Sequence, residues 1–153
     1  MLVDFRCGLT KEEILKLSTT LKQELPQDYQ DFLEQRNGCY IHDSYNVKIP
    51  FKRVDAGYLT FDFFFGMLND NSFYDIISFN EEFIHEIEHT KAIAIGDNGD
   101  GNTYFIINSS ARGGVYYCDR MNIHNNREFN RLYFVTDSFS KFYELVINNM
   151  SIQ

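Results

Sequence analysis

One short segment carries residue types that could hold a catalytic metal ion. Residues 85–89 read His-Glu-Ile-Glu-His, the H-E-x-x-H pattern in which two imidazoles one helical turn apart bind zinc and the glutamate acts as general base. On a helix, however, the apolar side chains of this region share one face, and His85 and His89 project from the opposite side. A solvated helix face explains the pattern better, so we predict no enzyme activity and keep a zinc hydrolase built on His85, Glu86 and His89 as an alternative.

A second polar segment, 97–102, has the composition of a calcium-binding loop. An EF-hand loop requires oxygen-bearing side chains at its third and fifth positions, and here these positions are Gly99 and Gly101. Asp, Asn and Gly tolerate positive φ and bond to their own backbone. The segment therefore predicts a tight hairpin turn in which Asp97 and Asp100 accept hydrogen bonds from turn amides. No cofactor is indicated.

The elements that position these segments follow from the apolar periodicity. Thr10 begins a capping-box pattern at the start of a helix over about 10–22, and a second helix runs from Pro26 toward Gly38. An amphipathic helix closes the chain. The intervening sequence predicts strands within 47–65 and near 92–96, 103–108, 114–118 and 131–135, with one or two helical segments over 72–89, a break at 78–80 and Asn80 as a cap. We therefore expect one α+β domain over 1–153, a mainly antiparallel sheet flanked by N-terminal and C-terminal helices.

Composition narrows the class of protein. The chain has 153 residues and is 44% hydrophobic, which suits a single domain with a full core. It has no apolar run of the ~20 residues that span a bilayer and no signal-peptide pattern, so we expect a soluble, cytoplasmic protein without membrane contact. Its three cysteines form no Cys-x-x-Cys pair and predict neither a disulfide framework nor a zinc knuckle.

The surplus negative charge lies in the middle of the chain. The formal net charge is -8, and Val54–Thr90 contains eight acidic residues and no lysine or arginine. These residues are Asp55, Asp62, Asp70, Asp75, Glu81, Glu82, Glu86 and Glu88. Such a segment argues against nucleic-acid binding and for attraction to a basic partner. Within it, Asp62 alternates with apolar neighbours and should point away from the core.

Four segments give the chain a resemblance to a known family. They are Leu25–Leu33 followed by Asn37-Gly38, then Ile93–Ile107, Gly114–Asp119 and Ser138–Phe142. Together they resemble the SMI1/KNR4 family, also called the SUKH superfamily. Its members show a Leu-Pro-x-x-Tyr/Phe-x-x-Phe-Leu helix ending in Asn-Gly, and further on an apolar strand, a Gly/Asp-rich turn and a second apolar strand. The resemblance implies the same α+β fold from the first third of the chain to its end.

The same resemblance implies a function in protein binding. Bacterial members of the family are immunity proteins that neutralise a cognate toxin domain, often a nuclease, whereas the eukaryotic namesake regulates cell-wall assembly. We therefore predict a non-enzymatic immunity protein whose partner is a basic toxin domain, with a regulatory adaptor for an endogenous protein as the alternative. The predicted contact residues, each offering a carboxylate to a Lys or Arg of the toxin, are Asp62, Asp70, Asp75, Glu81 and Glu82, followed by Asp97, Asp100 and Asp119.

Overall fold

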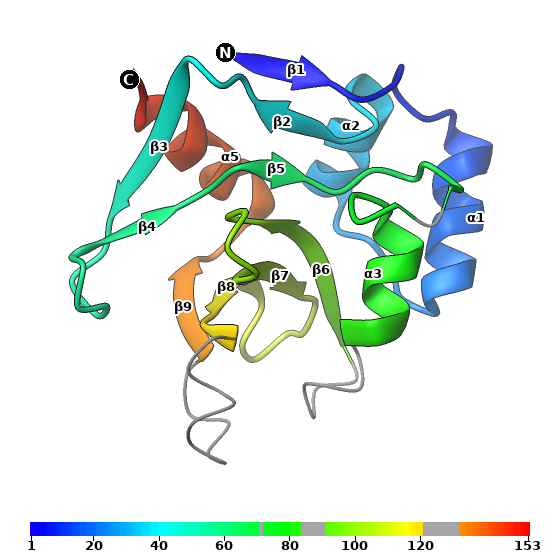
Figure 1. Ribbon diagram of the computed structural model, residues 1–153. Helices are drawn as coiled ribbons and strands as arrows, with labels where there is room; N and C mark the ends of the chain where they lie inside the picture. The colour runs from blue at the N-terminus through cyan, green and yellow to red at the C-terminus, as the bar shows by residue number, and fades with distance from the viewer. Residues whose placement is uncertain (71, 84–90, 121–131) are drawn as a thin grey trace.

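The computed structural model describes residues 1–70, 72–83, 91–120 and 132–153, which form two antiparallel sheets with helices packed around them (Figure 1). The described helices are α1 (Lys11–Leu21), α2 (Gln27–Gln35), α3 (Ile76–Phe83) and α5 (Phe139–Asn148). The strands are β1 (Leu2–Asp4), β2 (Cys39–Ile41), β3 (Tyr45–Pro50), β4 (Tyr58–Thr60), β5 (Phe63–Phe64), β6 (Ala92–Asp97), β7 (Thr103–Ile107), β8 (Gly114–Cys118), β9 (Leu132–Thr136) and β10 (Met150–Ile152). The predicted α+β class with a mainly antiparallel sheet is confirmed.

The larger sheet contains seven strands in the order β1-β2-β5-β6-β7-β8-β9, and neighbouring strands are antiparallel throughout. The smaller sheet has the order β10-β3-β4. The strands predicted near 92–96, 103–108, 114–118 and 131–135 are β6 to β9. The sequence did not predict β1, β2 or β10, because a three-residue strand gives too little alternation to detect.

The chain passes from the smaller sheet to the larger one at Phe61 and Asp62, between β4 and β5. Phe61 is fully buried and Asp62 is exposed, as the alternation predicts. The backbone of Asp62 still joins the larger sheet, because its N–H donates to the carbonyl of Asp97 (3.0 Å) and its carbonyl accepts from the N–H of Ile41 (2.7 Å). Asp62 is thereby held at a fixed place on the surface.

Capping residues fix where two helices begin. The hydroxyl of Thr10 accepts the N–H of Glu13 (3.2 Å), and the carboxylate of Glu13 accepts the N–H of Thr10 (2.8 Å). This is the complete capping box that the sequence predicts for α1. At the start of α5, the hydroxyl of Ser138 accepts the N–H of Lys141 (3.3 Å).

Of the two alternatives for 72–89, the one with two helical segments and a break at 78–80 is wrong, and the helix begins at Ile76 and not at residue 72. Helix α3 runs without interruption through these residues, and Asn80 lies inside it and is buried. The amide of Asn80 donates to the carbonyl of Ala94 (3.0 Å) and accepts the N–H of Ala94 (2.8 Å) in β6. Asn80 thus joins the helix to the sheet, a long-range role that local sequence does not show. The rest of the predicted helical segment, 84–89, lies outside the described residues.

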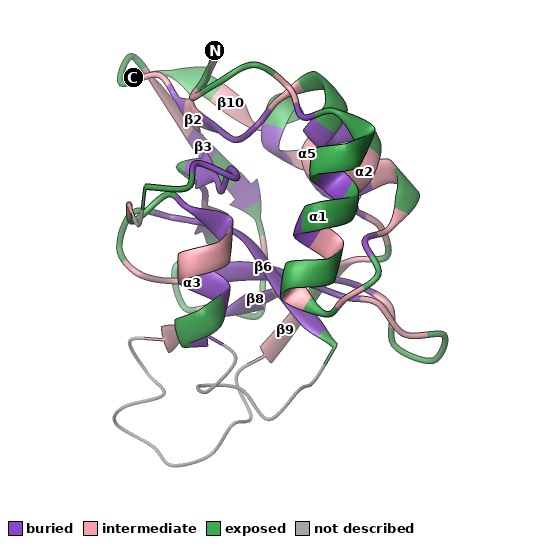
Figure 2. Cartoon of the chain, turned by 90° about the vertical axis from the view of Figure 1, so that its right-hand side faces the viewer, coloured by how far each residue is buried: buried purple, intermediate pink, exposed green. Residues whose placement is uncertain are grey.

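The core is rich in aromatic residues and lies between the larger sheet and the helices. The ring of Phe64 in β5 lies 5.0 Å from that of Phe32 in α2 and 6.1 Å from that of Phe142 in α5. Aromatic pairs at such distances add to the stability that comes from burial alone. Figure 2 shows β6 and β8 as a buried part of the sheet, behind helices whose outer faces are exposed.

Candidate functional site

A groove of about 630 Å³ lies where β2, β5, the loop before α3 and the turn between β6 and β7 meet. Its size falls in the range of ordinary ligand and peptide pockets. Six of its lining residues are aromatic, two are aspartates, and none of those that the structure describes is a lysine or arginine. The lining residues are Phe5, Tyr40, Ile41, Asp43, Tyr45, Asp62, Phe63, Phe73, Tyr74, Gly99 and Gln153.

The register of β2 and β5 explains why the groove is aromatic. Tyr40 and Phe63 are partners across the two strands, so both side chains lie on one face. The next residue, Phe64, points to the opposite face, where its ring packs 5.7 Å from Phe139 of α5. Helices α2 and α5 lie behind these strands in Figure 1. This end of the sheet therefore has one face covered by helices and one face that forms the floor of the groove.

Five of the six aromatic rings of the groove form one connected cluster. Ring centroids are separated by 4.8 Å between Phe63 and Tyr74, 5.0 Å between Phe5 and Tyr74, and 5.6 Å between Phe5 and Tyr40. Phe73 joins the cluster 5.6 Å from Phe63. Yet Phe73 is 54% exposed and Tyr74 is 41% exposed. An apolar patch of this kind next to a groove is typical of a surface that binds another molecule.

A pair of carboxylates lies at the edge of the groove. Partial burial and the neighbouring charge of Asp100 raise the pKa of Asp62. Gly99 allows this arrangement, because it has a positive φ of 78° and a Cβ at this position would overlap the Asp62 carboxylate. None of the described residues forms an ion pair with Asp62. The ionised form of Asp62 is therefore a poorly compensated charge at the groove.

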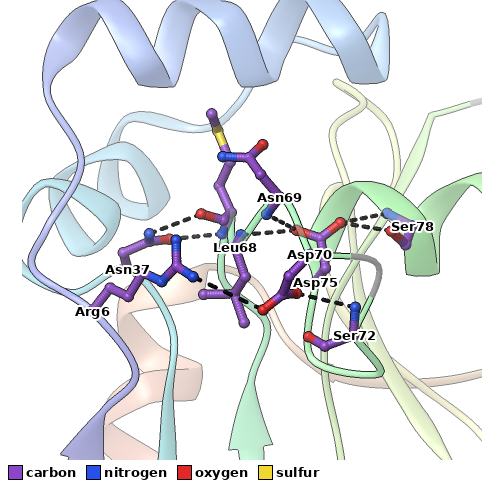
Figure 3. A network of polar contacts seen from close by, with 9 residues as sticks. Arg6, Asn37, Leu68, Asn69, Asp70, Ser72, Asp75 and Ser78 are labelled. Atoms are coloured by element: carbon purple, nitrogen blue, oxygen red, sulfur yellow. Dashed lines mark hydrogen bonds and ion pairs between the residues drawn. The ribbon is translucent and has the colours of Figure 1, made fainter.

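Asp75 stabilises the loop between β5 and α3, here called the groove loop, which forms one wall of the groove (Figure 3). It is only 2% exposed, and its Oδ1 accepts the N–H groups of Leu68 (2.8 Å) and Asn69 (3.1 Å). Its Oδ2 accepts the N–H (2.9 Å) and the hydroxyl (2.8 Å) of Ser78 in α3. Burial acts to raise the pKa of Asp75, but these hydrogen bonds outweigh it and lower the pKa. The carboxylate is occupied within the fold, which argues against its predicted contact with a partner.

Comparison with known protein families identifies the family of the chain. A sequence model of the SMI1 / KNR4 family (SUKH-1) matches residues 8–145, which is most of the chain. The chain belongs to the SMI1/KNR4 family. Members of the SMI1/KNR4 family are generally non-catalytic immunity or regulatory proteins, so family membership supports a role in protein binding. A search of the curated proteins found no match.

The Asn-Gly sequence of the SMI1/KNR4 pattern positions the other end of the groove loop. The side chain of Asn37 donates to the carbonyl of Met67 (3.0 Å) and accepts the N–H of Met67 (2.7 Å). Gly38 has φ +73°, and a Cβ on it would lie 2.7 Å from the backbone nitrogen of Gly66. Only glycine permits this conformation and this close approach at little cost. The residues that resemble the family therefore determine where the wall of the groove stands.

The segment 97–102 forms the predicted hairpin turn. Asp97 is fully buried, and its carboxylate accepts the N–H of Gly99 (2.8 Å). The other side-chain acceptor is Asn98, which receives the N–H of Asp100 (3.0 Å). Asp97 thus has the predicted structural role, whereas Asn98 takes the role that was predicted for Asp100. Burial raises the pKa of Asp97, and its carboxylate is not on the surface. The side chain of Asp100 is exposed.

The other predicted contact residues are distributed over separate elements. Asp70 is exposed on the groove loop, where its carboxylate lies 3.9 Å from the guanidinium of Arg6 (Figure 3). Glu81 and Glu82 are exposed on α3, and Asp119 is half-buried after β8. These three do not line the groove. The acidic middle segment is therefore spread over a strand connection, a loop and a helix.

The H-E-x-x-H residues His85, Glu86 and His89 lie outside the described residues. Among the residues that the structure does describe, no group of three His, Cys, Asp or Glu side chains could hold a metal ion. Over the same described ranges, no helix is long and apolar enough to cross a membrane.

Sequence reasoning missed the aromatic residues of the groove. It assigned the phenylalanines and tyrosines to the core because most of them follow a helical or strand period. Phe73 and Tyr74 fall within the helical segment predicted over 72–89, but in the structure they precede α3, which begins at Ile76. Two adjacent aromatic residues after a turn were the one signal available. Phe5, Tyr40 and Tyr45 gave no such signal, because they reach the groove only through long-range pairing.

Proposed function

We propose that the protein is a non-enzymatic immunity protein of the cytoplasm that binds a basic toxin domain and blocks its active site. The groove carries this proposal, because it combines exposed aromatic rings with carboxylates and has no cationic residue among its described lining. Aromatic residues supply much of the binding energy at protein interfaces, and complementary charge raises the association rate and selects the partner. A nuclease toxin binds an anionic backbone and therefore tends to be basic.

The contact surface that we propose differs from the one expected from sequence. Phe73 and Tyr74 are the central contacts, with Asp62 and Asp100 supplying negative charge beside them. Asp70 lies on the same loop as Phe73 and Tyr74, where Arg6 at 3.9 Å partly compensates its charge. Glu81, Glu82 and Asp119 are kept as peripheral residues that act through the overall field, consistent with the net charge of -8. Asp75 and Asp97 are removed from the contact set because both are buried.

Affinity capture from the native cell tests the proposal. The tagged protein is incubated with lysate at low salt, and bound proteins are released at high salt and identified. We expect a basic toxin domain, which the purified protein then inhibits in an activity assay. Capture and inhibition should both fail for Asp62→Lys and for Phe73→Ala.

The matched control is Glu24→Lys, which reverses an exposed charge outside the groove. It should retain capture and inhibition. If Glu24→Lys and Asp62→Lys lost capture and inhibition equally, the groove would be refuted as the binding site. Binding would then depend only on the net charge of the protein. Recovery of endogenous regulatory proteins without any toxin would refute immunity and favour the regulatory adaptor.

A further inference from the structure

Several charged and aromatic groups elsewhere on the protein surface are paired within the fold. Lys48 lies over the ring of Tyr58 at 5.1 Å, and Arg53 lies over the ring of Tyr133 at 5.2 Å. Carboxylates are paired in the same way, for example Asp137 with Lys141 at 2.8 Å. Some rings and carboxylates at the surface are thus covered by the protein's own cations.

The described lining of the groove has no such pairing. Within the described part of the chain, no lysine or arginine lies over Tyr40, Phe73 or Tyr74, and none pairs with Asp43 or Asp62. Both aspartates line the same groove as the rings. The groove therefore offers two kinds of acceptor for a cation, an aromatic face and a carboxylate, within one concave site.

The charge on Asp62 gives a partner cation a further advantage. Partial burial and the like charge of Asp100 disfavour the ionised carboxylate, which is why its pKa is raised. The other titratable residues that line the groove with Asp62 are Asp43, Tyr40, Tyr45 and Tyr74, and none of them is a cation at neutral pH. A cation that enters the groove relieves this repulsion as well as forming its own contacts.

We infer that the groove receives an arginine side chain from the partner protein, with the guanidinium paired to Asp62 and its plane packed on the aromatic cluster of Tyr40, Phe63, Phe73 and Tyr74. The inference deepens the proposed function and rests on it for the source of the arginine, a toxin domain. Guanidinium is planar, stacks on aromatic faces and binds a carboxylate through two parallel hydrogen bonds. Lysine provides a compact, strongly hydrated charge that can lie over a ring but cannot stack as a plane or form two parallel hydrogen bonds with a carboxylate.

The size and charge of the groove also favour a protein segment over other cationic or anionic ligands. A volume of about 630 Å³ accommodates a side chain together with the backbone that presents it. The lining aspartates repel phosphate groups, which argues against a nucleotide. The open shape at the junction of a strand pair, a loop and a turn suits an exposed loop that inserts one anchoring residue.

A peptide titration tests the inference without requiring the toxin. The ¹⁵N-labelled full-length protein is titrated with acetyl-Gly-Arg-Gly-amide and, separately, with peptides that carry lysine or citrulline in place of arginine. We expect saturable shifts of the Tyr40, Asp62 and Tyr74 amide signals with the arginine peptide. Lysine should bind at least ~3-fold more weakly, and citrulline, which has the same shape without charge, should produce no saturable shift.

Two single-residue variants complete the test. Asp62→Asn should weaken arginine-peptide binding ~10-fold, whereas Asp31→Asn, the matched change of an exposed aspartate on α2, should leave it unchanged. Equal shifts with all three peptides, or shifts located outside the groove, would overturn the inference. If arginine binds as expected but no toxin is captured, the proposed function fails and the arginine site stands. If the toxin binds through the groove but the arginine peptide does not, only the inference fails.

Discussion

The two parts of the seven-stranded sheet have different surroundings. Residues of β6 and β7 are buried without exception, and β8 is buried apart from one half-buried residue. At the other part, β2 and β5 have one face packed on helices and the other open at the groove. The first part has no exposed side chains with which to bind a partner. The groove face of the second part is covered by Phe73 and Tyr74 of the loop before α3, and these two rings are exposed to solvent.

This difference separates residues that stabilise the fold from residues that are available for binding. A fully buried aromatic side chain contributes to stability in proportion to the apolar surface removed from water. A ring that is half exposed contributes less to stability and leaves apolar surface that a partner can bury. The comparison therefore predicts that substitutions in the buried strands and in the loop over the groove change different measured quantities.

The largest expected effect comes from a matched pair of aromatic truncations. Phe105 in β7 is fully buried, 5.7 Å from the ring of Phe83, and Phe105→Ala should lower the free energy of unfolding by about 3–5 kcal/mol. Phe73→Ala should lower it by less than about 1 kcal/mol but weaken partner binding ~10-fold or more. Urea denaturation and binding calorimetry measure the two quantities. Similar stability losses in both variants would contradict the comparison.

An intermediate effect is expected where the groove loop meets the core. Asp75→Ala leaves the buried N–H groups of Leu68 and Asn69 without their acceptor, so the free energy of unfolding should fall by about 2–4 kcal/mol. Because the pKa of Asp75 is lowered from 3.8, its contribution is present above pH 3.8 and is lost as the pH falls through the lowered pKa. Denaturation of both proteins from pH 7 to pH 2.5 should show their stabilities converging. A constant difference would show that the charge of Asp75 is not responsible.

The smallest effect on stability is expected at Asp62, and it has the opposite sign. The pKa of Asp62 is raised above 3.8, so the ionised carboxylate destabilises the fold at neutral pH, and this penalty disappears as the pH falls through the raised pKa. Asp62→Asn should therefore unfold at the same or a slightly higher temperature at pH 7 and match the original protein below pH 3.8. Partner binding should nevertheless weaken. Lower thermal stability of Asp62→Asn at pH 7 would show that its carboxylate has a structural partner.

Local sequence predicted the features that depend on neighbouring residues. Three such features are predicted correctly: the capping box of Thr10 and Glu13, the strands β6 to β9, and the hairpin turn at Asp97. Each is formed by residues within a few positions of one another. The alternation of apolar and polar residues around Asp62 also predicts correctly that this residue is exposed. These signals were enough to predict the fold class.

Features that depend on long-range contacts could not be predicted in this way. Asn80 resembles a helix cap in sequence but bonds to β6, and Asp75 resembles a surface carboxylate but is surrounded by backbone donors. The groove is assembled from segments as far apart as Phe5 and Gln153. No local pattern reports such a meeting, so the acidic residues were identified by charge alone and the exposed aromatic rings were missed.

The anchoring of the groove loop has a consequence for how the protein can diversify. Asn37 and Asp75 hold the loop almost entirely through main-chain groups, which every amino acid except proline offers alike. The side chains at positions 73 and 74 take no part in this anchoring. Mutation at these two positions can therefore change the exposed surface of the groove while the backbone of the loop stays anchored, which is the property that the proposed immunity function requires.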